Sequence, residues 1–466
     1  MSESLIISAS GIRGIVGSGL TPEVVARYGA SFGTYVRSRA PGPGGHVLVG
    51  RDSRTSGDTL LDAVAAGVRS AGLDVRDMGI VATPTGLLAV EDDDRAVGGL
   101  LVTASHNPAE WNGLKLVSAD GTFLTADAGR EVQALYATGG SHVGWESVGT
   151  RVFQEGAIEH HLERILELPI LDAGRISGRR FRIVLDCVRG AGGLIVPELL
   201  DRLGCEVVGI DLEPDGRFPR APEPVPENLG ILGEAVVREG AAMGFAVDPD
   251  VDRLALVDER GRPVGEDWTL ALAVELVAGF DPGPVVTNLS SSRSIEDAAV
   301  RAGVPFHRAP VGEANVVARM IETGSTIGGE GNGGVILPEL HLGRDAPVGI
   351  ALILQLLTET KKPLSVLASE LPRYHIVKDK LDRPRASLDA VYAALRSTFP
   401  DAAADTQDGL RLAWRDRWLH VRPSGTEPIV RVIAEAPGEA DARSLVERAR
   451  QPLERLDSAG AVGGVR

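Results

Sequence analysis

An apolar run that breaks into a loop of small polar residues occurs three times in this chain, and it restricts the fold more than any other feature. The three loops are Thr103-Ala-Ser-His-Asn-Pro108, Asp248-Pro-Asp-Val-Asp-Arg253 and Gly328-Gly-Glu-Gly-Asn-Gly-Gly334. Each loop follows an earlier strand-to-helix turn of its own unit, such as the strand at 47–50 and the helix at 60–68 in the first. Alternating apolar strands and amphipathic helices are typical of α/β sheets. The sequence therefore predicts three related α/β domains with mixed sheets.

The pattern changes after about residue 364, where short strands alternate with two helices. Strands are expected at 374–377, 410–414, 418–421 and 429–434, and helices at 388–395 and 440–453. This favours a smaller C-terminal α+β domain. We therefore place four domains at residues 1–150, 151–258, 259–366 and 367–466. Two local expectations are a strand at 79–85 and a disordered tail at 458–464.

Charge and cysteine content restrict the class of function. The net charge of −16 over 466 residues argues against a nucleic-acid or anionic-membrane partner. Two cysteines cannot build a disulfide framework, and no apolar run approaches the ~20 residues that span a bilayer. The first residues also lack the basic segment of a signal peptide. We expect a cytoplasmic enzyme, monomeric or homodimeric, whose substrate is anionic only if basic residues gather locally.

Three alternating aspartates, Asp248, Asp250 and Asp252, end the apolar strand of the second unit. Carboxylates this close raise one another's pKa unless a cation neutralises them, and oxygen ligands suit Mg²⁺ or Ca²⁺. An EF-hand would need glycine where Arg253 stands, although Glu259 falls at the twelfth position. A haloacid-dehalogenase-type phosphatase would need Thr or Val in place of Asp252. A solvated acidic turn is the simplest alternative, and a magnesium loop is the interpretation we favour.

Ser105 and His106 follow a strand that Pro108 prevents from continuing. The simple interpretation is a strand-to-turn junction, and the functional one is a nucleophile at the mouth of the sheet. Lys115 is the only lysine before Lys361, which indicates a need for an amine that can titrate. His106 is the other nearby proton carrier. A Ser-His hydrolase is less convincing, because adjacent side chains on extended backbone point apart.

Two further loops carry binding groups. Glu330 and Asn332 are the only side chains among the glycines of the third loop, and a carboxylate with an amide suits a row of sugar hydroxyls. The alternative is a flexible surface turn. Near the C-terminus, Arg422-Pro-Ser-Gly-Thr-Glu-Pro428 joins two strands and offers hydroxyls, N–H groups and a guanidinium to a phosphate. A tight hairpin connection is the alternative there.

Taken together, these loops resemble the signatures of the α-D-phosphohexomutases in order and spacing, and Ser10-Gly-Ile-Arg-Gly14 and Trp111-Asn-Gly-Leu-Lys115 match as well. The resemblance covers essentially the whole chain. It implies four domains around a central cleft, with a phosphoryl group carried by Ser105. It also implies Mg²⁺ as cofactor, held by phosphorylated Ser105 with Asp248, Asp250 and Asp252. A hexose 1,6-bisphosphate would serve as intermediate and activator.

The resemblance also implies roles for individual residues. Transfer of the phosphoryl group would be assisted by Arg13 and Arg253, and the hydroxyl proton would be managed by Lys115 or His106. The sugar-binding residues would be Gly329, Glu330, Asn332, Arg308 and Gly312. The phosphate-binding residues would be Arg422, Ser424, Gly425, Thr426 and Arg431.

Departures from the family pattern bear on the substrate. Pro249 stands where glycine is usual in the aspartate loop, Asn332 replaces a common serine, and Gly331 stands where glutamine is frequent. The resemblance favours phosphoglucosamine mutase, with phosphomannomutase/phosphoglucomutase as the alternative. Two other classes remain open: a magnesium-dependent sugar phosphatase using Asp248 or Asp250, and a non-catalytic sugar-phosphate or Ca²⁺ sensor.

Overall fold

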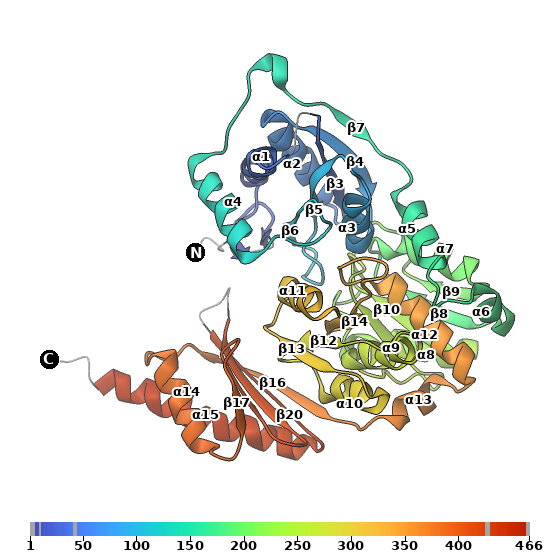
Figure 1. Cartoon of the computed structure of the whole chain (residues 1–466), viewed down its shortest axis with the longest axis vertical. Coiled ribbons are helices and arrows are strands. Elements are labelled where there is room, and N and C mark those ends of the chain that lie inside the picture. The colour runs from blue at the N-terminus through green and yellow to red at the C-terminus, as the bar shows by residue number, and fades with distance from the viewer. Residues whose placement is uncertain (1–4, 9–10, 41–43, 425–428, 463–466) are drawn as a thin grey trace.

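The computed structural model describes residues 5–8, 11–40, 44–424 and 429–462, with side chains up to residue 456. The strands of these residues form four sheets, three mixed and one antiparallel. In Figure 1 the first domain lies at the top, the second and third at the lower right, and the fourth at the lower left. The predicted fold class is therefore confirmed.

The first sheet has the strand order β1-β2-β6-β5-β3-β4-β7. Its strands are β1 (Ile6–Ser8), β2 (Gly11–Ile15), β3 (His46–Arg51), β4 (Asp74–Ile80), β5 (Ala96–Val102), β6 (Trp111–Val117) and β7 (Arg151–Phe153). Strand β3 runs parallel to both β4 and β5, whereas β6 is antiparallel to β5. Numbered along the chain, the four central strands β3 to β6 therefore lie in the order 4-3-1-2.

The second and third sheets repeat this order, as β11-β10-β8-β9 and β15-β14-β12-β13. Their strands are β8 (Arg182–Asp186), β9 (Glu206–Ile210), β10 (Met243–Val247), β11 (Leu254–Val257), β12 (Val285–Asn288), β13 (Phe306–Ala309), β14 (Ile327–Glu330) and β15 (Gly334–Ile336). In each sheet the fourth strand is antiparallel to the third. All three polar loops thus join the third strand to the fourth, at the carboxyl edge of the parallel strands, where α/β sheets bind ligands.

Helices cover these three sheets. They are α1 (Pro22–Arg37), α2 (Gly57–Ser70), α3 (Thr83–Glu91), α4 (Ala126–Thr138), α5 (Ala157–Leu166), α6 (Ala173–Arg179), α7 (Gly192–Arg202), α8 (Gly230–Glu239), α9 (Glu266–Phe280), α10 (Arg293–Ala302), α11 (Glu313–Thr323), α12 (Ala346–Thr360) and α13 (Leu364–Glu370). The start of α1 shows how the sequence sets such an element. The Thr21 hydroxyl accepts a hydrogen bond from the Val24 N–H at 3.3 Å, and Pro22 occupies the first turn, where its missing N–H costs nothing.

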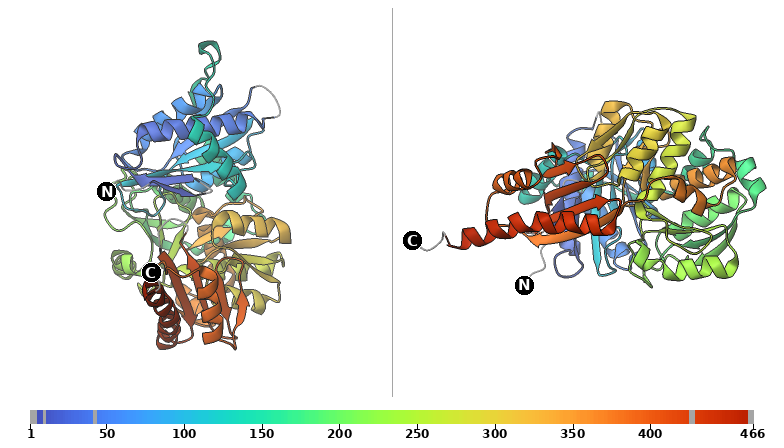
Figure 2. Two further views of the ribbon diagram at one scale, coloured as in Figure 1. Left: turned by 90° about the vertical axis from the view of Figure 1, so that its left-hand side faces the viewer. Right: turned by 90° about the horizontal axis from the view of Figure 1, so that it is seen from below.

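The fourth sheet is antiparallel, in the order β16-β20-β19-β18-β17. It contains β16 (His375–Asp382), β17 (Ala403–Asp405), β18 (Leu410–Ala413), β19 (Trp418–Pro423) and β20 (Ile429–Ala436), with helices α14 (Leu388–Thr398) and α15 (Glu439–Val462). Helix α15 packs along the sheet against β16 and β20, and Figure 2 shows it projecting at the edge of the molecule. The α+β character predicted for this domain is confirmed, although β17 was not foreseen.

Two local predictions are wrong. Residues 79–85 are not a strand, because β4 ends at Ile80 and α3 begins at Thr83. Pro84 lies in the first turn of α3, where proline favours a helix rather than a strand. Residues 458–462 continue α15 instead of being disordered, since alanines there extend an established helix. The rest of the expected tail, 463–464, lies outside the described residues.

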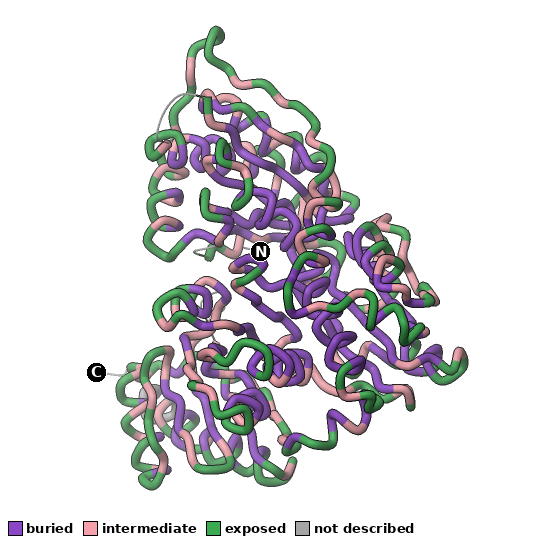
Figure 3. Tube along the Cα trace, turned by 45° about the vertical axis from the view of Figure 1, so that its right-hand side comes forward, coloured by how far each residue is buried: buried purple, intermediate pink, exposed green. Residues whose placement is uncertain are grey.

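The second and third domains share one apolar core, which also includes Ala82 and Leu88 from the first. Helix α12 of the third domain packs against α5, α6 and α7 as well as α9. The fourth domain has a separate core. In Figure 3 buried chain runs through the centre of the second and third domains, whereas the connection between α4 and β7 is mostly exposed. Across the described residues, no helix combines the length and apolar character that crossing a membrane requires.

Candidate active site

The serine loop (residues 103–108) holds Ser105 in an unusual backbone conformation. Ser105 has φ +49°, in the left-handed region that side chains other than glycine rarely adopt. Its N–H donates to Thr103 Oγ1 at 2.9 Å, and its hydroxyl donates to Asp248 Oδ2 at 2.8 Å. Ser105 is 2% exposed. A strained residue held by several contacts is typical of a functional position.

Arg54 fixes the rest of this loop. Its guanidinium donates to three carbonyls of the loop and to one at the start of β6, at distances between 2.6 and 2.9 Å. These carbonyls belong to Ser105, Asn107, Pro108 and Trp111. Arg54 is in turn paired with the buried Asp52, which also accepts the Thr103 hydroxyl at 2.7 Å. The hydrogen bonds from Arg54 therefore hold the strained backbone of Ser105 in place.

One argument from the sequence about His106 is wrong. We expected adjacent side chains to diverge on extended backbone, but the left-handed turn brings His106 Nδ1 to 3.3 Å from Ser105 Oγ. Burial, followed by the charges of Arg253 and Arg13, lowers the pKa of His106 to about 2. Its imidazole is therefore neutral here.

The aspartate loop (residues 248–253) lies between strands β10 and β11, which excludes the helix–loop–helix of an EF-hand. Asp248 Oδ1 accepts the N–H groups of Asp252 and Arg253 at 3.1 and 3.2 Å, which folds the loop around this carboxylate. Val251, at φ +66°, is the second strained residue of the site, and it is fully buried. Backbone strain therefore occurs at Val251, while Pro249 is accommodated without a left-handed conformation.

A lysine from the first domain forms ion pairs with two of these carboxylates. Lys115 Nζ lies 2.7 Å from Asp250 Oδ2 and 3.0 Å from Asp252 Oδ2. Burial acts to lower the pKa of Lys115, but Asp250 and Asp252 outweigh it and hold the pKa above its usual value. Thr83, at the start of α3, also donates to Asp250 Oδ2, at 2.8 Å. Lys115 is therefore an ammonium group in this arrangement.

The remaining oxygens of the loop fit a divalent cation. Asp250 Oδ1 and Asp252 Oδ1 are buried and have no hydrogen-bond partner, although burying an unpaired carboxylate oxygen is costly. One oxygen from each of Asp248, Asp250 and Asp252 can be chosen so that all lie within 4.8 Å of one another. Together with Ser105 Oγ beside Asp248, this all-oxygen set suits Mg²⁺.

The glycine loop (residues 328–334) presents Glu330 at the end of β14, and its carboxylate is already hydrogen-bonded on both oxygens. Oε1 accepts from Asn288 Nδ2 at 2.8 Å and from the Gly312 N–H at 3.2 Å. Oε2 is 3.0 Å from Arg344 Nη1 and 3.5 Å from Asn332 Nδ2. Gly329 must lack a side chain, because its φ is +150° and a Cβ there would meet the Gly334 carbonyl.

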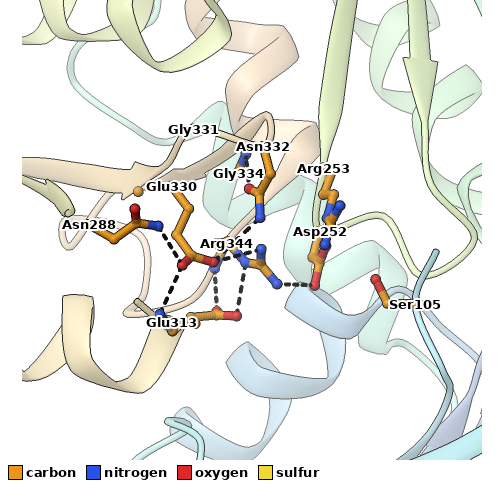
Figure 4. A network of polar contacts seen from close by, with 12 residues as sticks. Ser105, Asp252, Arg253, Asn288, Glu313, Glu330, Gly331, Asn332, Gly334 and Arg344 are labelled. Carbon is orange, nitrogen blue, oxygen red and sulfur yellow. Dashed lines mark hydrogen bonds and ion pairs between the residues drawn. The ribbon is translucent and has the colours of Figure 1, made fainter. Parts of the chain in front are cut away.

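Arg344 joins the glycine loop to the aspartate loop. Figure 4 shows its guanidinium between Glu330 and Glu313 on one side and Asp252 on the other, with Ser105 beyond Asp252. The Nη2 atom lies 2.8 Å from Asp252 Oδ2. The structure therefore brings Ser105, the three aspartates and Glu330 into one connected polar network.

The two other predicted arginines, Arg13 and Arg253, belong to this network electrostatically. Arg253 Nη1 is 2.9 Å from Glu223 Oε1, and its Nε is 3.7 Å from Asp252 Oδ1. Burial lowers the pKa of Arg13, against the nearby charge of Asp250. Both guanidinium groups thus add positive charge beside the aspartate loop.

Three of the predicted phosphate-binding residues, Arg422, Ser424 and Arg431, lie on or next to strands β19 and β20 of the fourth domain. Arg422 is 3.0 Å from Asp408 Oδ2, which also accepts the Val311 N–H at 3.1 Å, next to Gly312. Arg431 lies opposite Arg422 on the neighbouring strand, and the Ser424 N–H donates to the Ile429 carbonyl at 2.9 Å. Gly425 and Thr426 lie outside the described residues.

Arg308 joins a different group of residues. Its guanidinium binds the carbonyls of Asn288 and Ser291, at 3.0 Å each, and Glu296 at 3.2 Å. Arg308 therefore links the end of β12 and the loop after it to the first turn of α10. Its predicted contact with sugar stays a prediction.

Sequence reasoning missed Arg54, Thr83 and Arg344. All three act across long sequence separations, so no local pattern marks them. The one available signal for Arg54 was its place in Arg51-Asp-Ser-Arg54, directly after an apolar strand at the same sheet edge as Ser105.

Comparison with known proteins identifies the family of the chain. Four family profiles match in order: phosphoglucomutase/phosphomannomutase alpha/beta/alpha domain I at residues 5–142, domain II at 159–261, domain III at 265–374 and the C-terminal domain at 376–451. A "Probable phosphoglucosamine mutase" of Methanopyrus kandleri is 39% identical over 94% of this chain and 95% of its own length.

A second relative and a solved structure support the same family. A "Phosphoglucomutase/phosphomannomutase" of Thermococcus kodakarensis is also 39% identical, over 95% of this chain and 97% of its own. The crystal structure of a phosphoglucomutase/phosphomannomutase family protein from Burkholderia thailandensis superposes with a TM-score of 0.84 at 29% identity, and the match covers 99% of each chain. The chain therefore belongs to the phosphoglucomutase/phosphomannomutase family and is an enzyme of the phosphohexomutase type.

Proposed function

We propose that this enzyme interconverts hexose 6-phosphate and hexose 1-phosphate through a phosphoserine at Ser105 and a bound hexose 1,6-bisphosphate. The observation that carries the proposal is the 2.8 Å contact between Ser105 Oγ and Asp248 Oδ2, inside the same network as Glu330. Glucosamine phosphate is the proposed substrate, supported by the name of the Methanopyrus kandleri relative. Mannose or glucose phosphate is the second candidate, supported by the Thermococcus kodakarensis relative of equal identity.

The reaction consists of two phosphoryl transfers that balance each other. Phosphorylated Ser105 gives its phosphoryl group to the free hydroxyl of a hexose monophosphate, which leaves a serine hydroxyl and a hexose 1,6-bisphosphate. The bisphosphate then turns around and returns its other phosphoryl group to Ser105. The product is the isomeric monophosphate, and the phosphoserine is regenerated.

Charges of the chain surround the transferring group. Arg13 and Arg253 lie beside the aspartate loop, where positive charge stabilises the oxygens of a phosphoryl group in transfer. A bound Mg²⁺, held by Asp248, Asp250, Asp252 and phosphorylated Ser105, would supply further positive charge to the same oxygens. Lys115 forms ion pairs with two of these aspartates, Asp250 and Asp252.

Proton transfer falls to two groups on the first domain. His106, whose Nδ1 lies 3.3 Å from Ser105 Oγ, is the proposed proton carrier for the serine hydroxyl, and it would need the negative charge of a bound phosphoryl group to raise its lowered pKa. Lys115, as an ammonium group, can donate a proton or hydrogen bond to the leaving oxygen. These assignments retain both candidates named from the sequence.

The sugar and its second phosphate would bind on the far side of the network. Asn288, the Gly312 N–H and Arg344 hold the Glu330 carboxylate in one orientation, which makes it a pre-positioned acceptor for sugar hydroxyls. Asn332 and Gly312 flank this carboxylate. Arg422, with Ser424, Gly425, Thr426 and Arg431, would hold the phosphate that does not react.

A cytoplasmic location is part of the proposal. Both cysteines of the described chain, Cys187 and Cys205, are free and buried, as expected in a reducing compartment. The proposed small-molecule partners are the hexose phosphate and its bisphosphate. The assembly state proposed is a monomer or homodimer.

The test separates isomerisation from hydrolysis. Purified enzyme is incubated with Mg²⁺, a trace of glucose 1,6-bisphosphate and glucosamine 1-phosphate, and phosphorus NMR follows the sugar phosphates and free phosphate together. The proposal expects glucosamine 6-phosphate without accumulation of inorganic phosphate. Stoichiometric release of inorganic phosphate would instead identify a phosphatase, and binding of Ca²⁺ without any turnover would identify a sensor.

A competition experiment addresses the substrate. Equal concentrations of the 1-phosphates of glucosamine, mannose and glucose are supplied together, and the initial rate for each gives the ratio of kcat/KM values. The proposal expects glucosamine 1-phosphate to be preferred. A preference for mannose or glucose 1-phosphate would select the second candidate.

A further inference from the structure

Arg344 is the only described side chain whose contacts join all three carboxylates Asp252, Glu313 and Glu330. Its Nη2 lies 2.8 Å from Asp252 Oδ2, its Nη1 3.0 Å from Glu330 Oε2, and its Nε 3.0 Å from Glu313 Oε2. The side chain is 9% exposed. A planar guanidinium can satisfy three carboxylates at fixed angles, which a single ammonium group cannot do.

These contacts cross a domain boundary. Asp252 belongs to the aspartate loop of the second domain, whereas Glu330 and Arg344 belong to the third. Two backbone hydrogen bonds cross at the same place: the Leu254 N–H donates to the Gly333 carbonyl at 3.0 Å, and the Ala346 N–H donates to the Val251 carbonyl at 3.2 Å. Arg344 therefore adds the side-chain link between two loops whose backbones are already joined.

The backbone of Arg344 is itself firmly held. Its N–H donates to Glu313 Oε1 at 2.9 Å. The next residue, Asp345, caps α12 through the Val348 N–H and accepts from His161 Nε2 at 2.8 Å and His341 Nε2 at 2.9 Å. Asp345 and both histidines are buried. A guanidinium anchored in this way is restricted to one rotamer, so its nitrogens lie in fixed positions.

The charge balance shows what Arg344 does for Glu330. Without Arg344, the hydrogen-bond donors to Glu330 would be neutral: the amides of Asn288 and Asn332 and the Gly312 N–H. Asp252, in contrast, would keep Lys115 at 3.0 Å. Loss of Arg344 would therefore affect the orientation of the Glu330 carboxylate more than the charge state of the aspartate loop.

We propose that Arg344 is a positioning residue that holds the sugar-binding carboxylate Glu330 in a fixed relation to the metal-binding carboxylate Asp252. This inference rests on the proposed function. Its consequence is that the sugar hydroxyl to be phosphorylated is set at a constant distance from the phosphoryl group on Ser105 in both orientations of the bisphosphate. Misplacement by about 1 Å can cost about a hundredfold in rate.

The experiment is a double-mutant cycle with Arg344→Met and Glu330→Gln, accompanied by Arg344→Lys. Arg151→Met is the matched control, since Arg151 is paired with Asp62 and Asp77 at the far edge of the first sheet. For each protein we measure kcat and KM for the preferred hexose 1-phosphate and the thermal unfolding midpoint. Binding of glucose 1-phosphate is measured by calorimetry with Mg²⁺ on the Ser105→Ala background, where turnover does not interfere.

We expect Arg344→Met and Glu330→Gln each to lower kcat/KM by about a hundredfold. Because the two residues act as a unit, the double variant should be less than about threefold worse than the poorer single variant. Binding of glucose 1-phosphate should show the same lack of additivity. Arg344→Lys should recover part of the loss, and it serves as the test if Arg344→Met does not fold. Arg151→Met should change neither kcat/KM nor binding.

Additive effects in the cycle, or an Arg344→Met enzyme with nearly wild-type kcat/KM, would overturn the inference. A wild-type enzyme that binds glucose 1-phosphate but isomerises no hexose phosphate would refute the proposed function alone, because the binding cycle still tests Arg344. Failure of the wild type to bind or convert any hexose phosphate would overturn both.

Discussion

The aspartate loop and the glycine loop occupy equivalent positions, each between the third and fourth strands of sheets with the same strand order. The two loops nevertheless differ in whether the chain supplies hydrogen-bond donors to all of their carboxylate oxygens. In the aspartate loop, two buried carboxylate oxygens are left without a partner. In the glycine loop, both oxygens of Glu330 are bound by donors of the chain. One strand-to-strand connection is therefore incomplete without a cation, whereas the other is complete and rigid before any ligand arrives.

The serine loop is the third member of this set and combines features of both. Like the aspartate loop, it contains a non-glycine residue in the left-handed region. Like the glycine loop, it is held by an arginine, Arg54, from outside the loop. A repeated fold thus supplies three equivalent loops, and the difference among them lies in which polar atoms the chain itself satisfies.

The largest effect should come from breaking the cation site. Removing Mg²⁺ with a chelator is expected to abolish turnover, and added Mg²⁺ should restore it. Asp250→Asn removes one charge next to an unpaired oxygen, and we expect kcat/KM to fall about a thousandfold. Electron paramagnetic resonance of Mn²⁺ measures the binding directly. Undiminished Mn²⁺ binding and turnover in Asp250→Asn would show that this carboxylate is not a ligand.

A smaller effect, of a different kind, is expected from Glu330→Gln. The amide keeps the shape but loses the charge that Arg344 and the sugar hydroxyls use, so kcat/KM should fall about a hundredfold. Mn²⁺ binding should stay within about twofold of wild type, because Glu330 does not belong to the aspartate loop. A large loss of Mn²⁺ affinity in Glu330→Gln would mean that the two loops are not separable in function.

The third effect concerns stability rather than turnover, and it is a pH dependence beneath the glycine loop. Burial raises the pKa of Asp267 to about 8, and its Oδ1 accepts the Ser292 N–H at 2.8 Å. The unfolded chain releases this proton near pH 4, so the stability that the protonated carboxyl contributes is complete below about pH 4 and lost by about pH 8. Between these values the loss is at most about 1.4 kcal/mol per pH unit.

Asp267→Asn has no proton to lose and keeps the acceptor for Ser292. Urea unfolding of both proteins between pH 5 and 8 should therefore show the variant gaining on the wild type as pH rises. A difference that does not change with pH would show that Asp267 is ionised throughout this range.

Much of the fold could be predicted because apolar runs mark buried strands. The end of β10 was evident from the change at Asp248, and the start of α1 from Thr21-Pro22-Glu23. The short β17 was missed, since Ala403 and Ala404 give no β-branched or aromatic signal. Ser105 shows a second limit, because nothing in a non-glycine sequence indicates a left-handed backbone.

The site was predictable where its residues are adjacent in sequence and not where they are adjacent only in space. The aspartates stand within five positions of one another, so their shared role could be read directly. Arg344 lies 92 positions from its partner Asp252, and Arg54 lies 51 from Ser105. The role of Arg54 depends on which strands are neighbours in the first sheet, and that of Arg344 on how the second and third domains pack, so adjacency in sequence marks neither.

The central claim is that Ser105 accepts and returns a phosphoryl group, and mass spectrometry of the intact protein and of its peptides tests it most directly. The enzyme is incubated with glucose 1,6-bisphosphate and Mg²⁺, digested and sequenced, then challenged with glucose 1-phosphate. We predict one acid-stable phosphoryl group per chain, located on Ser105, removed by glucose 1-phosphate and absent from Ser105→Ala. An unmodified Ser105, or a hydroxylamine-labile phosphoryl group on Asp248 or Asp250, would contradict the account.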